Sequence, residues 1–180
     1  MDKDLAEPKS GPVELGIRSK SAVGSGANKN MKIRLVTRVV IYDPNSKRVL
    51  LVKNRDQGFW YPPGGGWEYD RENIVECAER EVVEETGLKV KVARLLYVQE
   101  FHSAPDSISF ETIWLAMPTG ETGLSELHTD HDIDGKVEVA KWFLRDELRG
   151  IKVFPERLKD TFWQNIDRFL RDENPFIGVS

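Results

Sequence analysis

The sequence predicts an α/β domain in which helices cover both faces of one sheet. Five segments rich in β-branched residues are typical of strands, and polar turns and loops separate them. Two other segments, 72–86 in mid-chain and 156–172 near the end, repeat apolar residues at helical spacing. Strands with a helix on either side stack in three layers, so we expect an α/β/α sandwich.

The composition favours a single soluble domain. The chain has 180 residues, of which 39% are hydrophobic and 31% charged, enough for a sizeable core. A net charge of −4 gives no basic surface for DNA or RNA, so we expect a small-molecule substrate and no nucleic acid partner. The oligomeric state stays open between a monomer and a homodimer.

No apolar run resembles a signal peptide or approaches the roughly 18 residues of a membrane span, so we expect a cytoplasmic protein with no membrane partner. The single cysteine, Cys77, cannot form an internal disulfide. Its place in the segment 72–86 predicts a small, partly buried side chain rather than a nucleophile.

The first part of the chain divides into a tail and a hairpin. Residues 1–30 hold too little apolar surface to offset the entropy of ordering, so we expect a disordered tail or a partner-contacting arm before a domain of residues 31–180. Lys32–Tyr42 and Arg48–Val52 are predicted strands, and residues 43–46 are the turn between them.

The following residues, 53–71, are too rich in Pro and Gly for regular structure. The aromatic residues in this loop indicate that it holds the substrate. Trp60 and Tyr61 are the candidates to stack on a base, with packing of the loop itself as the alternative for each.

Segment 72–86 predicts a helix that packs on a core. Its apolar stripe consists of Ile74, Val75, Ala78 and Val82. Gly87 is expected to end the helix in the left-handed conformation.

Three glutamates, Glu81, Glu84 and Glu85, crowd the edge of that stripe, and the spacing lets Arg80 reach only the side of Glu84. Two interpretations follow. The glutamates form either a solvated acidic face or a site for a hard cation such as Mg²⁺, which prefers oxygen ligands.

Two more strands, Val90–Phe101 and Ser109–Met117, follow around a short loop that contains Pro105. Their imperfect alternation is expected for strands covered on both faces. A polar loop, 119–136, is of the kind that is functional or disordered, and Val137–Phe143 returns to strand.

The chain ends in helical segments. Asp146–Leu148 predicts a short turn, and Pro155 stands at the start of the helix 156–172. The stripe of that helix consists of Leu158, Phe162, Ile166, Phe169 and Leu170.

The stretch from Gly66 to Leu88 resembles the signature of the Nudix hydrolase family, G-x5-E-x7-R-E-U-x-E-E-x-G-U, in which U is aliphatic. Every specified position is filled, by Gly66, Glu72, Arg80, Glu81, Val82, Glu84, Glu85, Gly87 and Leu88. This resemblance to MutT-like enzymes implies a three-layer α/β/α sandwich with a mixed sheet. It also implies a Mg²⁺-dependent hydrolase, with Mn²⁺ as a substitute, that cleaves a diphosphate linkage in a nucleoside diphosphate linked to another group.

The resemblance assigns the metal to the three glutamates Glu81, Glu84 and Glu85 and to a glycine carbonyl. The common pattern GGG-x-E-x-G-E places a glutamate one position earlier than the run GGGWEYDRE of this chain does, so that Arg71 resembles an insertion. The carbonyl therefore belongs to Gly66 or to Gly65.

Further roles follow from the same resemblance. Arg80 and Glu72 orient the cluster, and Gly87 is structural. The general base is Glu81, Glu138 or a carboxylate of the loop 119–136. Arg55 stands where relatives place a phosphate-contacting arginine, with an ordinary exposed loop arginine as the alternative.

The identity of the substrate stays open. Pro105 lies 17 residues past Leu88, a spacing that resembles ADP-ribose hydrolases. The run Gly65–Glu68, GGWE, resembles relatives that act on diphosphoinositol or dinucleoside polyphosphates.

Two other functions compete with hydrolysis. One is a ligand-sensing module of the same fold that does not turn over. The other is calcium binding, because Asp130, Asp132, Asp134 and Gly135 spell the opening of an EF-hand loop. That pattern fails at its twelfth position, which is Lys141, and the residues that follow predict a strand.

Overall fold

The computed structural model describes residues 32–104, 106–120 and 137–178. Three of the expectations above lie outside these ranges: the tail 1–30, the proline at position 105, and the acidic loop with Asp130, Asp132 and Asp134.

The described residues form one five-stranded mixed sheet. Its strands are β1 (Lys32–Asp43), β2 (Arg48–Asn54), β3 (Val90–Ala104), β4 (Ser107–Pro118) and β5 (Val137–Phe143). Their order is β3-β4-β1-β2-β5. The central strands β1 and β4 run parallel, and the other neighbours are antiparallel.

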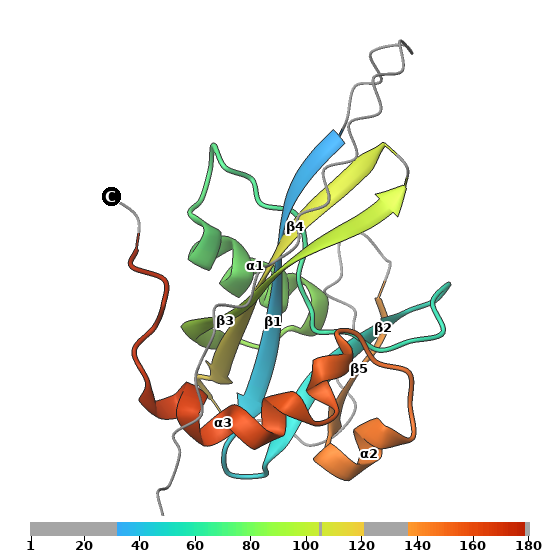
Figure 1. Cartoon of the computed structure of the whole chain (residues 1–180), viewed down its shortest axis with the longest axis vertical. Coiled ribbons are helices and arrows are strands. Elements are labelled where there is room, and N and C mark those ends of the chain that lie inside the picture. Colours follow the sequence, from blue (N-terminus) through green and yellow to red (C-terminus); the bar gives the residue numbers. More distant parts are fainter. Residues whose placement is uncertain (1–31, 105, 121–136, 179–180) are drawn as a thin grey trace, which may run out of the picture.

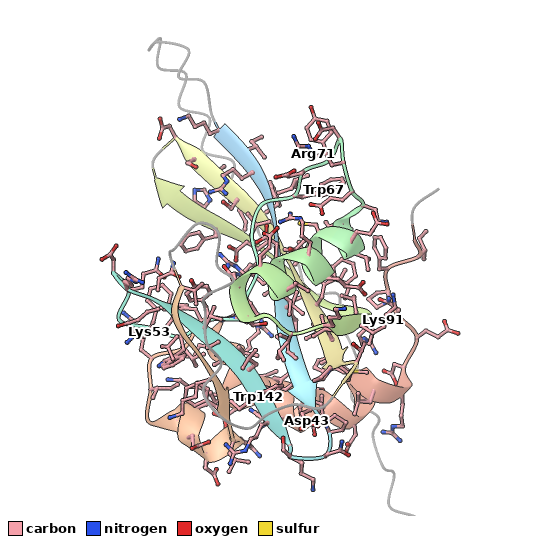
Figure 2. The ribbon with its side chains drawn as sticks, turned by 180° about the vertical axis from the view of Figure 1, so that it is seen from behind. Asp43, Lys53, Trp67, Arg71, Lys91 and Trp142 are labelled. Atoms are coloured by element: carbon pink, nitrogen blue, oxygen red, sulfur yellow. The ribbon has the colours of Figure 1, made fainter. Side chains whose placement is uncertain are left out.

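Helices lie on opposite faces of this sheet. They are α1 (Ile74–Thr86), α2 (Arg145–Arg149), the 3₁₀ turn η1 (Glu156–Leu158) and α3 (Thr161–Arg171). Figure 1 views the sheet from the side of α3, and Figure 2, turned by half a rotation, has α1 in front. The three-layer arrangement predicted from the sequence is confirmed.

The sheet separates two apolar cores because successive side chains of a strand point to opposite faces. In β2, Leu50 belongs to the core under α1, and its neighbour Leu51 belongs to the core under α3. Neither side chain is exposed at all. Trp114 and Trp142 fill the α1 side, and Phe162 fills the α3 side.

Helix α1 begins two residues later than predicted. Asn73 is its N-cap, with a side chain that accepts hydrogen bonds from the backbone of Val75 and Glu76, and the side chain of Glu76 bonds back to Asn73. This capping box fixes the start of the helix, so Glu72 precedes the helix. Gly87, with φ of 71°, ends it in the left-handed conformation, as predicted.

The last predicted helix is divided. Residues 156–158 form a 3₁₀ turn, and α3 begins at Thr161. Phe162 and Phe169 are buried as expected, whereas Leu170 is 44% exposed. The predicted stripe was therefore one residue too wide.

The prediction that β3 and β4 are covered on both faces is wrong for their outer ends. Val98 and Phe101 are 60% and 52% exposed, and Ile33 in β1 is 65% exposed. Figure 1 shows why: the hairpin of β3 and β4 and the start of β1 extend past the helices.

The residues after the acidic loop form β5, as predicted, rather than the exiting helix of an EF-hand. In the ranges that the structure describes, no helix combines the length and the apolar character needed to cross a membrane.

Candidate active site

A glycine-rich segment, residues 61–67, lies alongside the first half of β1. The backbone N–H of Thr37 donates to the carbonyl of Gly65 (2.9 Å), and that of Val39 donates to the carbonyl of Pro63 (2.8 Å). Strand β2 pairs with the last residues of β1. The segment therefore satisfies the backbone of β1 where β2 has diverged from it.

Two glycines allow this close approach. Gly64 has φ of 143°, and a Cβ there would lie 2.1 Å from the carbonyl oxygen of Thr37. At Gly65, a Cβ would lie 2.4–2.5 Å from the carboxyl atoms of Glu81. The segment thus fits tightly between β1 and the side chains of α1.

Arg80 connects three carboxylates along one side of α1. Its Nε and Nη2 donate to Glu72 at 2.9 and 2.7 Å, and its Nη1 donates to Glu81 at 2.9 Å and to Glu84 at 2.8 Å. The expectation that Arg80 reaches only Glu84 is wrong, because Glu72 precedes the helix and lies beside the guanidinium. The single positive charge of Arg80 therefore offsets part of the repulsion among the three carboxylates.

The residues just before α1 are held by a tryptophan. The indole N–H of Trp67 donates to the carbonyl of Glu72 at 2.9 Å, and Figure 2 places Trp67 beside the start of the helix. Glu72 is thereby fixed where both of its carboxylate oxygens meet Arg80.

Hydrogen bonding and burial move the pKa values in this cluster in opposite directions. The hydrogen bonds from Arg80 lower the pKa of Glu72 below its usual value, and the same bonds raise the pKa of Arg80. Burial raises the pKa of Glu81, although the neighbouring Arg80 counteracts it. Glu81 is therefore the least compensated buried carboxylate of the group.

Glu85 faces the glycine segment. Its Oε2 accepts a hydrogen bond from the backbone N–H of Gly64 at 2.9 Å. The carbonyl oxygen of Gly64 in turn accepts a hydrogen bond from Nη1 of Arg38 at 2.6 Å. Gly64 therefore connects a glutamate of α1 to an arginine of β1.

A cleft of about 410 Å³ opens next to this segment. Aromatic rings from three parts of the chain line it, with polar groups at its edges. The lining residues are Arg38, Asn54, Gln57, Phe59, Tyr61, Pro62, Gln99, Phe101, Glu111, Lys152, Phe154 and Pro155. The size and the mixture suit a small molecule with one flat apolar part.

The family model of the NUDIX domain matches residues 32–171. The chain belongs to this family. Its Nudix box is the stretch from Gly66 to Leu88, which the resemblance had indicated.

Two curated relatives show how far the similarity extends. The NAD-capped RNA hydrolase ndx-9 of Caenorhabditis elegans is 28% identical over 138 residues, which are 76% of this chain and 34% of that protein. The 8-oxo-dGDP phosphatase NUDT18 of Homo sapiens is 35% identical over 113 residues, which are 61% of this chain and 32% of that protein. The chain thus spans about a third of the length of these relatives.

Solved structures share the fold. A MutT NUDIX hydrolase from Burkholderia pseudomallei has a TM-score of 0.56 at 24% identity, over 71% of this chain and 95% of that one.

The donor set of the Nudix box fits a hard cation. Carboxylates and a glycine carbonyl are the oxygen ligands that Mg²⁺ takes. The carbonyl of Gly65 is used by Thr37, whereas that of Gly66 faces Arg80 at 3.4 Å. In the described part of the chain, no three acidic, His or Cys side chains already form a metal cage, because Arg80 bridges Glu81 and Glu84.

Of the three predicted substrate residues, the structure brings one to the cleft. Tyr61 lines it, and its hydroxyl donates to Asn54. Trp60 packs edge-on against Phe143 at 4.7 Å between ring centroids, so it follows the packing alternative. Arg55 is exposed in a turn and is not among the lining residues.

Glu138 makes an ion pair with a residue outside the box. Its carboxylate pairs with Nζ of Lys53 at 3.2 Å. The same Nζ lies 5.9 Å from the ring centroid of Trp60, which packs against the core under α3. Figure 2 shows Lys53 well away from Trp67 and Arg71, which mark the loop leading into α1.

Sequence reasoning missed Arg38, Glu111 and Phe154, which line the cleft. The first two carried a signal. Each is a charged residue inside an otherwise apolar strand, LVTRVVIY and SFETIWLAM, and a charge in such a place needs a partner or a function.

Proposed function

We propose that the protein is a Mg²⁺-dependent hydrolase that cleaves a diphosphate linkage in a nucleoside diphosphate linked to another group. The observation that carries this proposal is the position of the carboxylates. Glu81 and Glu85 face the glycine segment, and Tyr61 and Pro62 of the same segment line the aromatic cleft. A diphosphate attached to a base in the cleft would lie beside both glutamates.

Glu81, Glu84 and Glu85 would hold the cation, with the carbonyl of Gly66. Such a cation, when bound, neutralises phosphate oxygens and acidifies water. Arg80, fixed by Glu72, keeps Glu81 and Glu84 together and limits their mutual repulsion. Among the described carboxylates, Glu81 is the candidate general base because it lies in the cluster and Glu138 does not.

The reaction consumes one water. Its oxygen forms a bond to one phosphorus, the anhydride bond of that phosphorus breaks, and the water proton leaves to the base. The chain therefore contributes positioning and charge compensation rather than a covalent intermediate.

The names of the relatives support a diphosphate substrate. One is named for 8-oxo-dGDP and the other for NAD-capped RNA, and both compounds contain a nucleoside attached to a diphosphate. Aromatic rings dominate the apolar lining of the cleft, which suits a base better than an inositol ring surrounded by phosphates.

A panel of diphosphates assayed for phosphate or nucleotide release, with Mg²⁺, Mn²⁺ or chelator, tests the proposal. On the best substrate, Glu84→Gln and Glu85→Gln should each lower turnover by at least about 100-fold, or about 2.7 kcal/mol. Glu79→Gln is the matched control, because Glu79 lies on the same helix but accepts from the backbone of Val92 in β3 at 3.1 Å. Its activity should stay within about two-fold.

Full activity of Glu85→Gln, or turnover that persists in excess chelator, would refute the proposal. Tight binding of a diphosphate without hydrolysis in Mg²⁺ would instead support the ligand-sensing alternative.

A further inference from the structure

Arg38 stands where the aromatic cleft meets the glutamates of the Nudix box. On one side its guanidinium lines the cleft and lies 5.1 Å from the ring centroid of Tyr61. On the other, its Nη1 donates to the carbonyl of Gly64, whose N–H donates to Glu85. Only one residue, Gly64, therefore separates this cation from a proposed metal ligand.

The guanidinium is held in place from several directions. Glu111, on the neighbouring strand β4, is 9% exposed and lies 3.7 Å from Nε of Arg38. Gln99 on β3 donates to the other oxygen of that carboxylate. Together with Tyr61 and Gly64, these contacts orient the arginine before any ligand arrives, which lowers the entropic cost of binding.

Arg38 nevertheless keeps capacity for an anion. In the described ranges, its hydrogen bonds and ion pairs involve Nη1 and Nε, and the contact to Glu111 is too long for a hydrogen bond. Nη2 therefore has N–H groups to offer. A planar guanidinium suits the paired oxygens of a phosphate.

Three other cations near the site are placed differently. Arg80 is engaged with three carboxylates. Lys152 lies at the other end of the cleft, 5.8 and 6.0 Å from the rings of Phe59 and Phe154. Arg55 does not line the cleft.

From these contacts we infer that Arg38 is the phosphate-binding arginine of this site, positioned by Glu111, and that it fixes the diphosphate next to the nucleoside. This inference rests on the proposed function for the class of ligand. It replaces Arg55 with Arg38 as the side chain that contacts phosphate.

Binding of non-hydrolysable ligands tests the inference without any turnover. The probes are the α,β-methylene diphosphates of the four common ribonucleosides and the matching nucleosides, titrated calorimetrically in Mg²⁺. The measured quantity is the ratio of the nucleoside Kd to the diphosphate Kd. In Arg38→Gln this ratio should fall by about 10-fold, the value of one charge-assisted hydrogen bond, whereas nucleoside affinity should stay within about two-fold.

Arg48→Gln is the matched control, because Arg48 has nearly the same exposure as Arg38 and the same kind of contacts. It pairs with Glu147 at 3.6 Å and donates to the carbonyl of Trp142, away from the cleft. Its ratio should equal that of the wild type.

If Arg38→Gln does not fold, as judged by circular dichroism, Arg38→Gln/Glu111→Gln removes both charges and avoids an unpaired buried carboxylate. An unchanged ratio in the folded variant, or no gain from the diphosphate in the wild type, would overturn the inference. The proposed hydrolysis is tested separately. If the Kd ratio depends on Arg38 but Glu85→Gln keeps full activity, the inference on Arg38 holds and the proposed function fails.

Discussion

At the scale of single residues, Arg80 donates to three carboxylates because its guanidinium carries five N–H groups in a rigid fork. A lysine has one nitrogen and cannot span Glu72, Glu81 and Glu84 together. Arg80→Lys should therefore lower the free energy of unfolding by about 1–2 kcal/mol, a moderate value because Arg80 is 30% exposed. Urea denaturation in chelator measures it, with Arg48→Lys as the control.

Cys77 gives a second prediction at this scale. The sequence predicted a small, partly buried side chain, and the structure buries it completely on the inner face of α1. Burial raises the pKa of the thiol to about 12, so almost none of it is thiolate at pH 8. Iodoacetamide at pH 8 should leave native protein unlabelled and modify it fully in denaturant, as measured by mass spectrometry. Labelling of the native protein at the rate of a free thiol would show that α1 opens readily.

The residues of the box were recognisable from the sequence because their spacing is fixed within one helix and its flanks. The partners of those residues were not. Glu72 meets Arg80 only because the helix begins after Asn73, and Glu85 meets Gly64 across 21 positions. The contact between Glu85 and Gly64 depends on how β1 and the glycine segment pack, and no local sequence pattern encodes that packing.

At the scale of elements, the glycine segment predicts opposite outcomes for neighbouring substitutions. Gly64→Ala puts a Cβ 2.1 Å from a backbone oxygen at φ of 143°, where nothing can yield, so it should cost about 3 kcal/mol or more of stability. Gly65→Ala meets only the carboxyl end of Glu81, which can rotate away. Its stability should change by about 1 kcal/mol or less, while turnover should fall by at least about 10-fold because Glu81 is displaced.

Thermal unfolding and steady-state kinetics on both variants separate the two effects. Equal loss of stability in both would mean that the segment is held rigidly against α1 as well as β1. Full activity in Gly65→Ala would mean that the position of Glu81 does not matter for turnover.

The elements themselves were predictable to different degrees. Helix α1 was predicted because its apolar stripe and its final glycine are local signals. The predicted helix 156–172 is divided into a 3₁₀ turn and α3. The sequence did not indicate this break, because apolar residues on both sides of Asp160 continue the same helical period. The pairing of residues 61–67 with β1 was missed, because Pro and Gly indicate the lack of a strand and say nothing about a neighbour whose N–H groups donate to their carbonyls.

At the scale of the whole molecule, composition and periodicity predicted three layers, but not which strands are neighbours. The parallel pair of β1 and β4 joins residues about 75 positions apart, and it brings Arg38 beside Glu111 at one end of the cleft. The cleft is thus a product of topology. Its residues come from β1, β2, β3, β4 and two loops, so their convergence appears only once the sheet is assembled.

The layering leads to a final prediction on β2. Leu50 and Leu51 are adjacent in the chain and fully buried, one in each core. Because both faces of the strand are covered, Leu50→Ala and Leu51→Ala should each lower the free energy of unfolding by about 2–5 kcal/mol. A strand covered on one face would give one costly and one nearly neutral substitution.

Val98→Thr on the exposed edge strand β3 is the control, with an expected change within about 0.5 kcal/mol. Urea denaturation of the three variants measures this, and a small effect at Leu51 would show that α3 and the turn before it do not form a stable third layer.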